Sequence, residues 1–278
     1  MKSEAFLNYY IYNAEVYETE EIHPFENISS SMIYEVIRII DGIPLFLEEH
    51  LERLRKSAQI LGQKIHKSDE DIEKEIVKLV LMNDCKNINV KLLCTNLEKE
   101  KQDFFTYFIK SYYPEKKVYE KGIHTILYRS ERKNPNAKVL NASFKESVKE
   151  LLEKENAFEA ILVNEDESIT EGSRSNMFFV KNNKVYTASG QKVLLGVTRN
   201  KIMEVCKSLG IQVIEKSIYE SEIPTLQGAF MSGTSVNVLP IESIGKDHIH
   251  SVDNPIIQKI GKGYIEEMKK YLQSKSAK

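Results

Sequence analysis

The sequence has little cysteine, little net charge and no long apolar run, and each absence excludes a class of protein. Its three cysteines (Cys85, Cys94 and Cys206) are widely spaced and form no Cys-x-x-Cys pair. We therefore expect a reducing, cytoplasmic location and no metal site. The formal net charge of −2 gives no electrostatic reason to expect binding to nucleic acid.

Apolar stretches are short throughout the chain. No segment approaches roughly eighteen consecutive apolar residues, so we expect no membrane span. The N-terminal segment MKSEAFLNYY lacks the apolar core of a secretory signal. We find no internal repeat, and residues 273–278 look like a frayed tail. Of the 278 residues 41% are hydrophobic and 29% charged, which is typical of a globular protein with one large or two medium domains.

The first half of the chain predicts strands followed by helices. Residues 34–40 form a candidate strand, and Asp41-Gly42 is a favoured two-residue turn into a returning strand at 43–47. Tyr34 and Arg38 share one face of that strand, so Arg38 faces either a cleft or, on an edge strand, the solvent. We expect further strands at 6–12, 15–17, 87–94 and 104–112, a loop at 21–31, and helices at 48–61 and 69–82.

Arg53 lies beside the apolar stripe of the first expected helix. A guanidinium in that position can bind phosphate at two points. Alternatively, Arg53 is an ordinary surface arginine paired with Glu49.

The lysine- and glutamate-rich segment 113–122 reads as an exposed connection. We therefore predict a smaller N-terminal α/β domain at residues 1–118, a linker at 119–123 and a larger C-terminal domain at 124–278.

Two charged residues of the second half have apolar neighbours. Lys138 lies beside Ala137 and Val139, where desolvation would lower the pKa of its amine and make it nucleophilic. Alternatively, its stem packs while the amine reaches water. Glu171 precedes an apolar strand at 177–180, where a buried carboxylate needs a cation, although it could also cap a turn.

Two segments of the second half could bind an anion. Gly196 allows close approach of the backbone, and Thr198 is a candidate N-cap for a helix at 199–209, whose first N–H groups would bind negative charge. The second segment is Ser232-Gly233-Thr234-Ser235, which follows a strand at 229–231. Both segments suit a phosphate group.

Six motifs occur along the chain in one order. They are YEVIR (34–38), HLERL (50–54), KVLN (138–141), TEGSRSN (170–176), LLGVTR (194–199) and SGTSVNVLPI (232–241). With these motifs the chain resembles the class IV (fold-type IV) pyridoxal-phosphate aminotransferases, from about residue 8 to 270. That family includes branched-chain and D-amino acid aminotransferases and aminodeoxychorismate lyase. The resemblance implies an α/β fold of two domains with the cofactor between them, and a homodimer.

The resemblance also implies the role of each site residue. Lys138 would bond to the aldehyde of pyridoxal 5'-phosphate and then move a proton on the substrate. Glu171 would pair with the ring nitrogen, and Leu194 would pack on the ring. The phosphate would be held by Arg53, Val197, Thr198, Thr234 and Ser235.

Departures from the family pattern concern the substrate. Residues 25–31 replace the Asp-Arg-Gly segment of many members. Ser143 stands where branched-chain enzymes have a tyrosine. Cys94 stands near the arginine with which D-amino acid enzymes bind the substrate carboxylate.

Three residues of the first half are the candidate substrate ligands. Lys91 aligns near an arginine of the branched-chain enzymes and could receive the carboxylate, and the other two are Tyr34 and Arg38. We expect a transaminase acting on an amino acid and a 2-oxo acid, with branched-chain amino acids favoured. The alternatives are an aminodeoxychorismate lyase, a protein that binds the cofactor without turnover, and a plain α/β interaction module.

Overall fold

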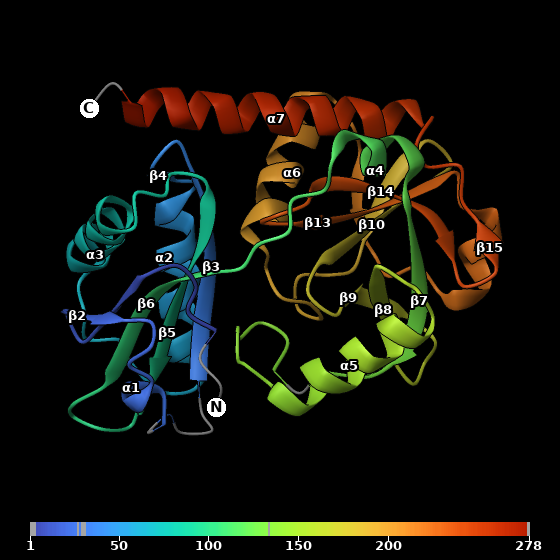
Figure 1. Ribbon diagram of the computed structural model, residues 1–278. Coiled ribbons are helices and arrows are strands. Elements are labelled where there is room, and N and C mark those ends of the chain that lie inside the picture. The colour runs from blue at the N-terminus through green and yellow to red at the C-terminus, as the bar shows by residue number, and fades with distance from the viewer. Residues whose placement is uncertain (1–3, 27, 29–31, 133, 277–278) are drawn as a thin grey trace. The chain divides into compact units, whose positions relative to one another are not determined.

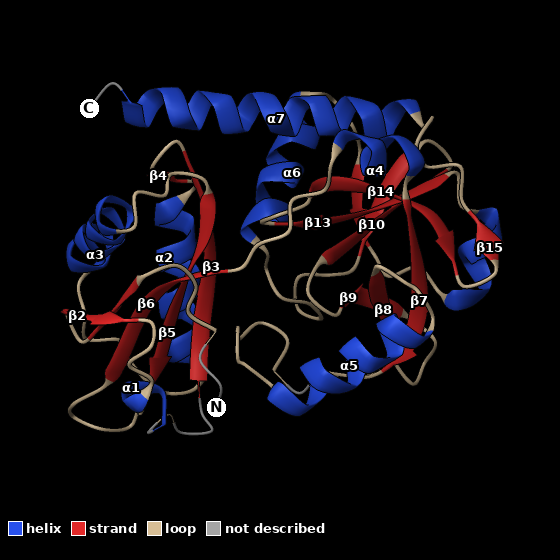
Figure 2. Ribbon diagram, viewed as in Figure 1, coloured by secondary structure: helices blue, strands red, loops and turns tan. Residues whose placement is uncertain are grey.

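The computed structural model describes residues 4–26, 28, 32–132 and 134–276 (Figures 1 and 2). By its internal contacts the chain divides into two compact units. Unit 1 contains residues 1–112, 137–140 and 270–278, and unit 2 contains residues 113–136 and 141–269. The grouping of 137–140 and 270–278 with the N-terminal residues was not expected. Helix α4 (Lys116–Lys121) lies in the segment expected to be an exposed connection, and the predicted domain boundaries stay a prediction.

Unit 1 is built on one sheet with the strand order β2-β1-β6-β5-β3-β4. All the pairings within it are antiparallel. Its strands are β1 (Tyr9–Tyr12), β2 (Glu15–Glu18), β3 (Met32–Ile40), β4 (Ile43–Pro44), β5 (Ile88–Thr95) and β6 (Asp103–Ile109). Asp41 and Gly42 both have positive φ, as the expected tight turn between β3 and β4 requires.

Helices α2 (Leu47–Ile60) and α3 (Asp69–Met82) cover one face of this sheet (Figure 1). Side chains along β3 point alternately to the two faces of the sheet. Those of Ile33, Ile37 and Ile39 point to the helix side and are buried in the same apolar core as the inner residues of both helices. The opposite face of β3 presents Tyr34 and its partly buried neighbours. A short helix, α1 (His23–Glu26), interrupts the segment expected as a loop, whose residues 27 and 29–31 lie outside the described part.

Unit 2 contains strands that close into a ring. Its strands are β7 (Ile123–Arg129), β8 (Glu159–Val163), β9 (Ile169–Gly172), β10 (Asn176–Lys181), β11 (Lys184–Thr187), β12 (Val213–Glu215), β13 (Gly228–Gly233), β14 (Asn237–Ile244) and β15 (Asp247–His248). The path β10-β13-β14-β7-β8-β9 returns to β10 through the pairing of Glu171 with Asn176. The candidate acid of the sequence analysis therefore lies at the seam of the ring.

The helices of unit 2 include α5 (Ala142–Lys154), α6 (Val197–Ser208), a 3-10 helix at Glu220–Thr225 and most of α7 (Pro255–Ser276). Helix α7 was not predicted, although Ile257, Ile260, Tyr264 and Met268 form its buried face. Residues 273–276, expected as a frayed tail, are its last turn, and 277–278 lie outside the described residues. Among the described residues, no helix has the length and hydropathy needed to cross a bilayer.

Candidate active site

The carboxylate of Glu171 is buried in unit 2 among hydrogen-bond donors. Its Oε2 accepts the N–H of Leu194 at 3.1 Å and lies 3.4 Å from the amide Nδ2 of Asn176. Its Oε1 lies 3.3 Å from a guanidinium nitrogen of Arg132. Donors and a positive charge around a buried carboxylate favour its ionised form. The Glu171 carboxylate thus accepts a backbone N–H and lies beside a guanidinium, an environment that suits pairing with a cation.

Asn176 connects this acid to the segment that precedes α6. Its Nδ2 also donates to the backbone oxygen of Leu194 at 2.8 Å. Its Oδ1 is so close to Gly196 that a Cβ atom added there would lie 2.2 Å away. Only glycine fits at that position without displacing the asparagine. Asn176 thus orients Glu171 and Leu194 together, a role that its place in the 170–176 motif signalled but the sequence analysis did not assign.

The N-terminus of α6 begins directly after this segment. The structure corrects the expectation that Thr198 is the N-cap, because Gly196 has the extended backbone of a cap and the helix starts at Val197. The N–H groups of Val197 and Thr198 therefore lie in the first turn, where a helix has no acceptors of its own. Helix α6 packs against β13, and Thr234 and Ser235 form the turn after that strand.

The backbone of Lys138 is hydrogen-bonded to residues of unit 1. Its carbonyl oxygen accepts the N–H of Tyr34 at 3.1 Å, and its N–H donates to the hydroxyl of Ser57 at 3.1 Å. The neighbouring Val139 forms an isolated bridge with Ile33. The ammonium Nζ of Lys138 lies 4.7 Å from the centre of the Tyr34 ring, within the range of a cation–π contact.

A second lysine contacts the same ring. The Nζ of Lys91 lies 5.1 Å from the centre of the Tyr34 ring and 5.8 Å from that of Tyr107. Lys91 is only 3% exposed, and its ammonium forms an ion pair with Glu4. Arg38 lies on the same strand face as Tyr34, four positions along β3. Unit 1 thus brings together Lys138 and the candidate substrate ligands Tyr34 and Lys91.

Arg53 is buried rather than on the surface, and it pairs with Glu35. Its Nε donates to Oε1 of Glu35 at 2.7 Å and its Nη2 to Oε2 at 2.6 Å. Nδ1 of His50 lies 2.9 Å from the same carboxylate. Glu35 was missed, although a glutamate between Ile33 and Ile37 on a core-facing strand signals a buried ion pair.

Burial and charge set the protonation states of Glu35 and His50 beside Arg53. Burial alone would raise the pKa of Glu35, but the charge and hydrogen bonds of Arg53, with a bond from His50, lower that pKa to about 2. Burial lowers the pKa of His50 below its usual value, against the opposing effect of Glu35. At neutral pH the cluster is an ionised carboxylate, a guanidinium and a neutral imidazole.

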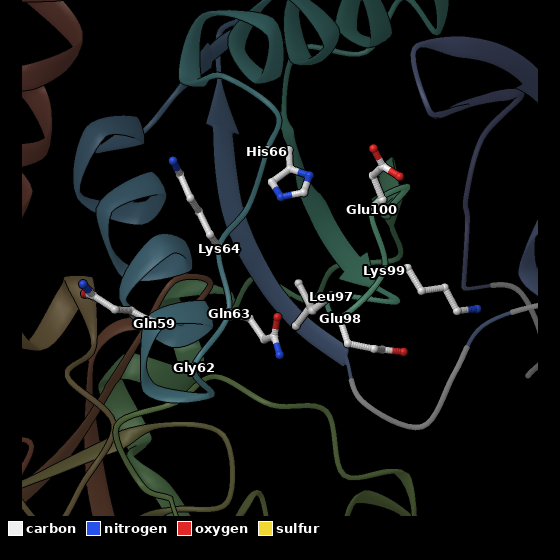
Figure 3. Close-up of a pocket in the computed structure, with 9 residues that line it drawn as sticks. All are labelled: Gln59, Gly62, Gln63, Lys64, His66, Leu97, Glu98, Lys99 and Glu100. Carbon is white, nitrogen blue, oxygen red and sulfur yellow. The ribbon is translucent and has the colours of Figure 1, made fainter.

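Two pockets differ in what lines them. The one in unit 2, about 460 Å³ in volume, has Glu171, Arg132, Thr170 and Lys192 in its wall. The other, in unit 1, has a volume of about 580 Å³ and is lined mainly by polar and charged side chains, with Leu97 and Gly62 among them, between the end of α2 and the β5–β6 turn (Figure 3). No residue singled out by the sequence analysis lines this second pocket. The described residues hold no cluster of three potential metal ligands.

The donor set fits the cofactor that the family resemblance implies. Pyridoxal phosphate requires an amine for its aldehyde, an acid for its ring nitrogen and donors for its phosphate. In unit 1 Lys138 would supply the amine, and in unit 2 the carboxylate of Glu171 would suit a protonated ring nitrogen and the first turn of α6 would supply N–H donors.

Comparison with known proteins identifies the same family that the six motifs indicate. Residues 32–244 match the model of the family described as amino-transferase class IV. The chain is 30% identical over 230 residues to a D-alanine aminotransferase of Bacillus licheniformis, which covers 79% of this chain and 81% of that protein. It is 29% identical over 248 residues to a probable branched-chain-amino-acid aminotransferase of Rickettsia felis, covering 84% and 86%.

The fold is similar to that of solved aminotransferases. The branched-chain aminotransferase of Thermoproteus uzoniensis, solved with norvaline, matches with a TM-score of 0.82 and 23% identity, covering 96% of this chain and 98% of that one. The expected α/β, fold-type IV architecture is therefore confirmed. The chain belongs to the class IV aminotransferases, the pyridoxal-phosphate enzymes that transfer an amino group between an amino acid and a 2-oxo acid.

Proposed function

We propose that the chain transaminates a branched-chain amino acid, with Lys138 as its catalytic residue and Glu171 as the acid on the cofactor ring. The observation that carries the proposal is the network around Glu171, in which Leu194 and Asn176 bind one carboxylate oxygen. Because both donors come from fixed backbone or buried side chains, the carboxylate is preorganised for a cation.

Lys138 holds and moves the proton. When bound, pyridoxal phosphate would supply an electron sink for the pair of electrons left on the substrate Cα. The Lys138 amine would take the proton from the substrate Cα and hold it at Nζ. Its backbone bonds to Tyr34 and Ser57 support this role, because they fix the point from which the side chain extends.

The phosphate would be bound mainly by the first turn of α6. The N–H groups of Val197 and Thr198 suit an anion because the helix leaves them without acceptors. Thr234 and Ser235 add hydroxyl donors after β13. Arg53 would contribute charge, and its bidentate bond to Glu35 supports this role by fixing the guanidinium plane. Leu194 would pack on the ring.

Lys91 would receive the substrate carboxylate, with Tyr34 and Arg38 beside it. Its buried ammonium already binds one carboxylate, that of Glu4, which supports an affinity for this group. The similarity to several branched-chain enzymes supports the same substrate class. The similarity to D-alanine aminotransferases makes D-amino acids the competing substrates. We further propose a cytoplasmic homodimer, as the family resemblance implies, which light scattering would test.

The first experiment is the absorption spectrum of the protein with pyridoxal phosphate. We expect a visible band in the native protein and its loss in Lys138→Ala. A colourless native protein would refute the proposal. Single-turnover bleaching by L- and D-amino acids then separates the substrate classes. Bleaching by D-alanine but not by L-leucine would overturn the branched-chain assignment, and pyruvate formed from aminodeoxychorismate would indicate a lyase.

The second experiment tests Glu171. Glu171→Gln should lower kcat about 100-fold or more, because the neutral amide no longer holds the ring nitrogen protonated. Cofactor affinity should fall far less. The matched control is Glu165→Gln, since Glu165 lines the same pocket but is exposed. Equal half-reaction rates in native protein and Glu171→Gln would show that this acid does not act on the ring.

A further inference from the structure

Glu159 is a second buried carboxylate of unit 2, at the first position of β8 and 0% exposed. Its Oε1 accepts hydrogen bonds from the hydroxyl of Ser173 at 2.6 Å and from the N–H of Ala160 at 2.9 Å. Its Oε2 accepts from the hydroxyl of Ser175 at 2.8 Å. Nε of Arg174 lies 3.9 Å from Oε2. A buried carboxylate is costly unless donors surround it, and here the donors come chiefly from one short segment.

That segment, residues 173–175, is the turn between β9 and β10, and it separates Glu171 from Asn176. The backbone fixes it as well, since the N–H of Ser173 donates to the oxygen of Ala160 at 2.8 Å. The N–H of Gly172 donates to the oxygen of Ser175 at 2.8 Å. A Cβ atom at Gly172 would lie 2.1 Å from the Ser175 hydroxyl, so the turn is tightly packed.

We propose that Glu159 is a positioning residue for transamination. By binding both serines of the 173–175 turn, it holds the end of β9 so that Glu171 keeps its orientation toward the cofactor ring. This inference rests on the proposed role of Glu171. Glu159 acts through the turn, whose residues follow Glu171 along the chain.

A carboxylate suits this task better than an amide. A carboxylate only accepts hydrogen bonds, so its two oxygens can serve both hydroxyls and the N–H of Ala160 at once. A glutamine has one acceptor oxygen, so one of the two serines would have to reverse its hydrogen bond. Glu159→Gln should therefore loosen the turn partly, and Glu159→Ala should release it.

The test uses the cofactor-loaded enzyme and measures two quantities, kcat and the pH dependence of the absorption of the bound cofactor. In Glu159→Ala we expect kcat to fall about 100-fold, as displacement of a catalytic group by about 1 Å can cause. The pH profile should shift in the direction seen in Glu171→Gln. Glu159→Gln should lie between native protein and Glu159→Ala in both quantities.

The double variant Glu159→Ala/Glu171→Gln decides whether Glu159 acts through Glu171. We expect it to be no slower than Glu171→Gln alone, because the turn then has no acid left to position. Multiplication of the two losses would overturn the inference. If Glu171→Gln alone leaves the pH profile unchanged, the proposed function has failed, and not merely the inference about Glu159.

Two further sets of variants separate positioning from general destabilisation. Glu75, a buried carboxylate of unit 1, accepts from the Thr106 hydroxyl at 2.8 Å and pairs with Lys67. Glu75→Gln should lower the melting temperature but leave the pH profile of the cofactor unchanged. Should Glu159→Ala not fold, Ser173→Ala and Ser175→Ala each remove one hydrogen bond and should shift the profile by a smaller amount. An unchanged profile in both would overturn the proposal.

Discussion

Arg53 and Glu35 form a buried pair with two parallel hydrogen bonds, one to each carboxylate oxygen. Arg53 comes from α2 and Glu35 from β3, so the pair joins the helix to the sheet of unit 1. Because both charges are buried, the loss of either one removes the oppositely charged partner of the other.

Glu35→Gln should therefore destabilise the protein by about 3–5 kcal/mol. The measurement is urea unfolding of the cofactor-free protein. Glu52→Gln is the matched control. Glu52 pairs with Lys56 on the exposed side of α2, and this ion pair should contribute less than about 0.5 kcal/mol to the free energy of unfolding. Similar unfolding midpoints for the two variants would contradict this account of the pair.

The same cluster predicts how stability depends on pH. The carboxyl pKa of Glu35 is about 2 in the folded chain against 4.5 ordinarily. Its stabilisation is complete above pH 4.5 and is lost as the pH falls toward 2, on the order of 3 kcal/mol in all. The pKa of His50 is below 6.5 when folded, so the unfolded chain binds a proton first and stability also decreases below pH 6.5.

Urea midpoints measured across this range should fall in two stages, the first starting near pH 6.5 and the second near pH 4.5. His50→Gln should abolish the first stage and keep the second. Persistence of the first stage in that variant would assign it to another group.

Gly196→Ala should weaken cofactor binding. A Cβ atom there would lie 2.2 Å from Oδ1 of Asn176 and would displace this side chain from Leu194 and Glu171. We expect a stability loss of about 1–3 kcal/mol and a clear rise in the Kd for pyridoxal phosphate, measured by fluorescence. Gly261→Ala is the control, because the added atom comes no closer than 4.0 Å to Val238. Unchanged cofactor affinity in Gly196→Ala would contradict the proposed phosphate site.

Glu4→Gln should improve the binding of substrate carboxylates. In the native chain the Glu4 carboxylate pairs with Lys91, where we place the substrate carboxylate, so the two would compete. Removal of one partly exposed ion pair should lower the KM for the 2-oxo acid about two- to fivefold. Glu15→Gln, at an exposed strand position near the N-terminus, should leave KM unchanged. A raised KM in Glu4→Gln would indicate that Lys91 does not receive the substrate.

The elements set by local sequence were predictable, and those set by distant partners were not. Helix α3 was predicted at its observed bounds, and the Asp41-Gly42 turn has the expected conformation, since both depend on neighbouring residues. The Arg53–Glu35 pair joins residues 18 positions apart on different elements, so it depends on tertiary packing. The closure of the ring between β9 and β10 is equally invisible to local patterns.

The site shows the same division. The six motifs singled out Lys138 and Glu171 as candidates, because the order of chemical groups along the chain is visible in a sequence, but they placed the start of α6 two residues too late. The sequence did not single out Asn176 or Glu159, because the roles proposed for them depend on the hydrogen bonds they make to other segments. Hydrogen bonds of this kind become evident only when the strands are placed side by side.

The first turn of helix α2 is hydrogen-bonded to Tyr271, a residue distant in the sequence. The residue before the helix, Phe46, carries no polar side chain, and the hydroxyl of Tyr271 accepts the N–H of Leu47 at 3.1 Å and donates to Glu48 at 2.7 Å. During synthesis, these contacts of unit 1 can therefore form only after Tyr271 has left the ribosome. A nascent chain paused before Tyr271 should therefore be cleaved faster at the start of α2 than the chain that includes it.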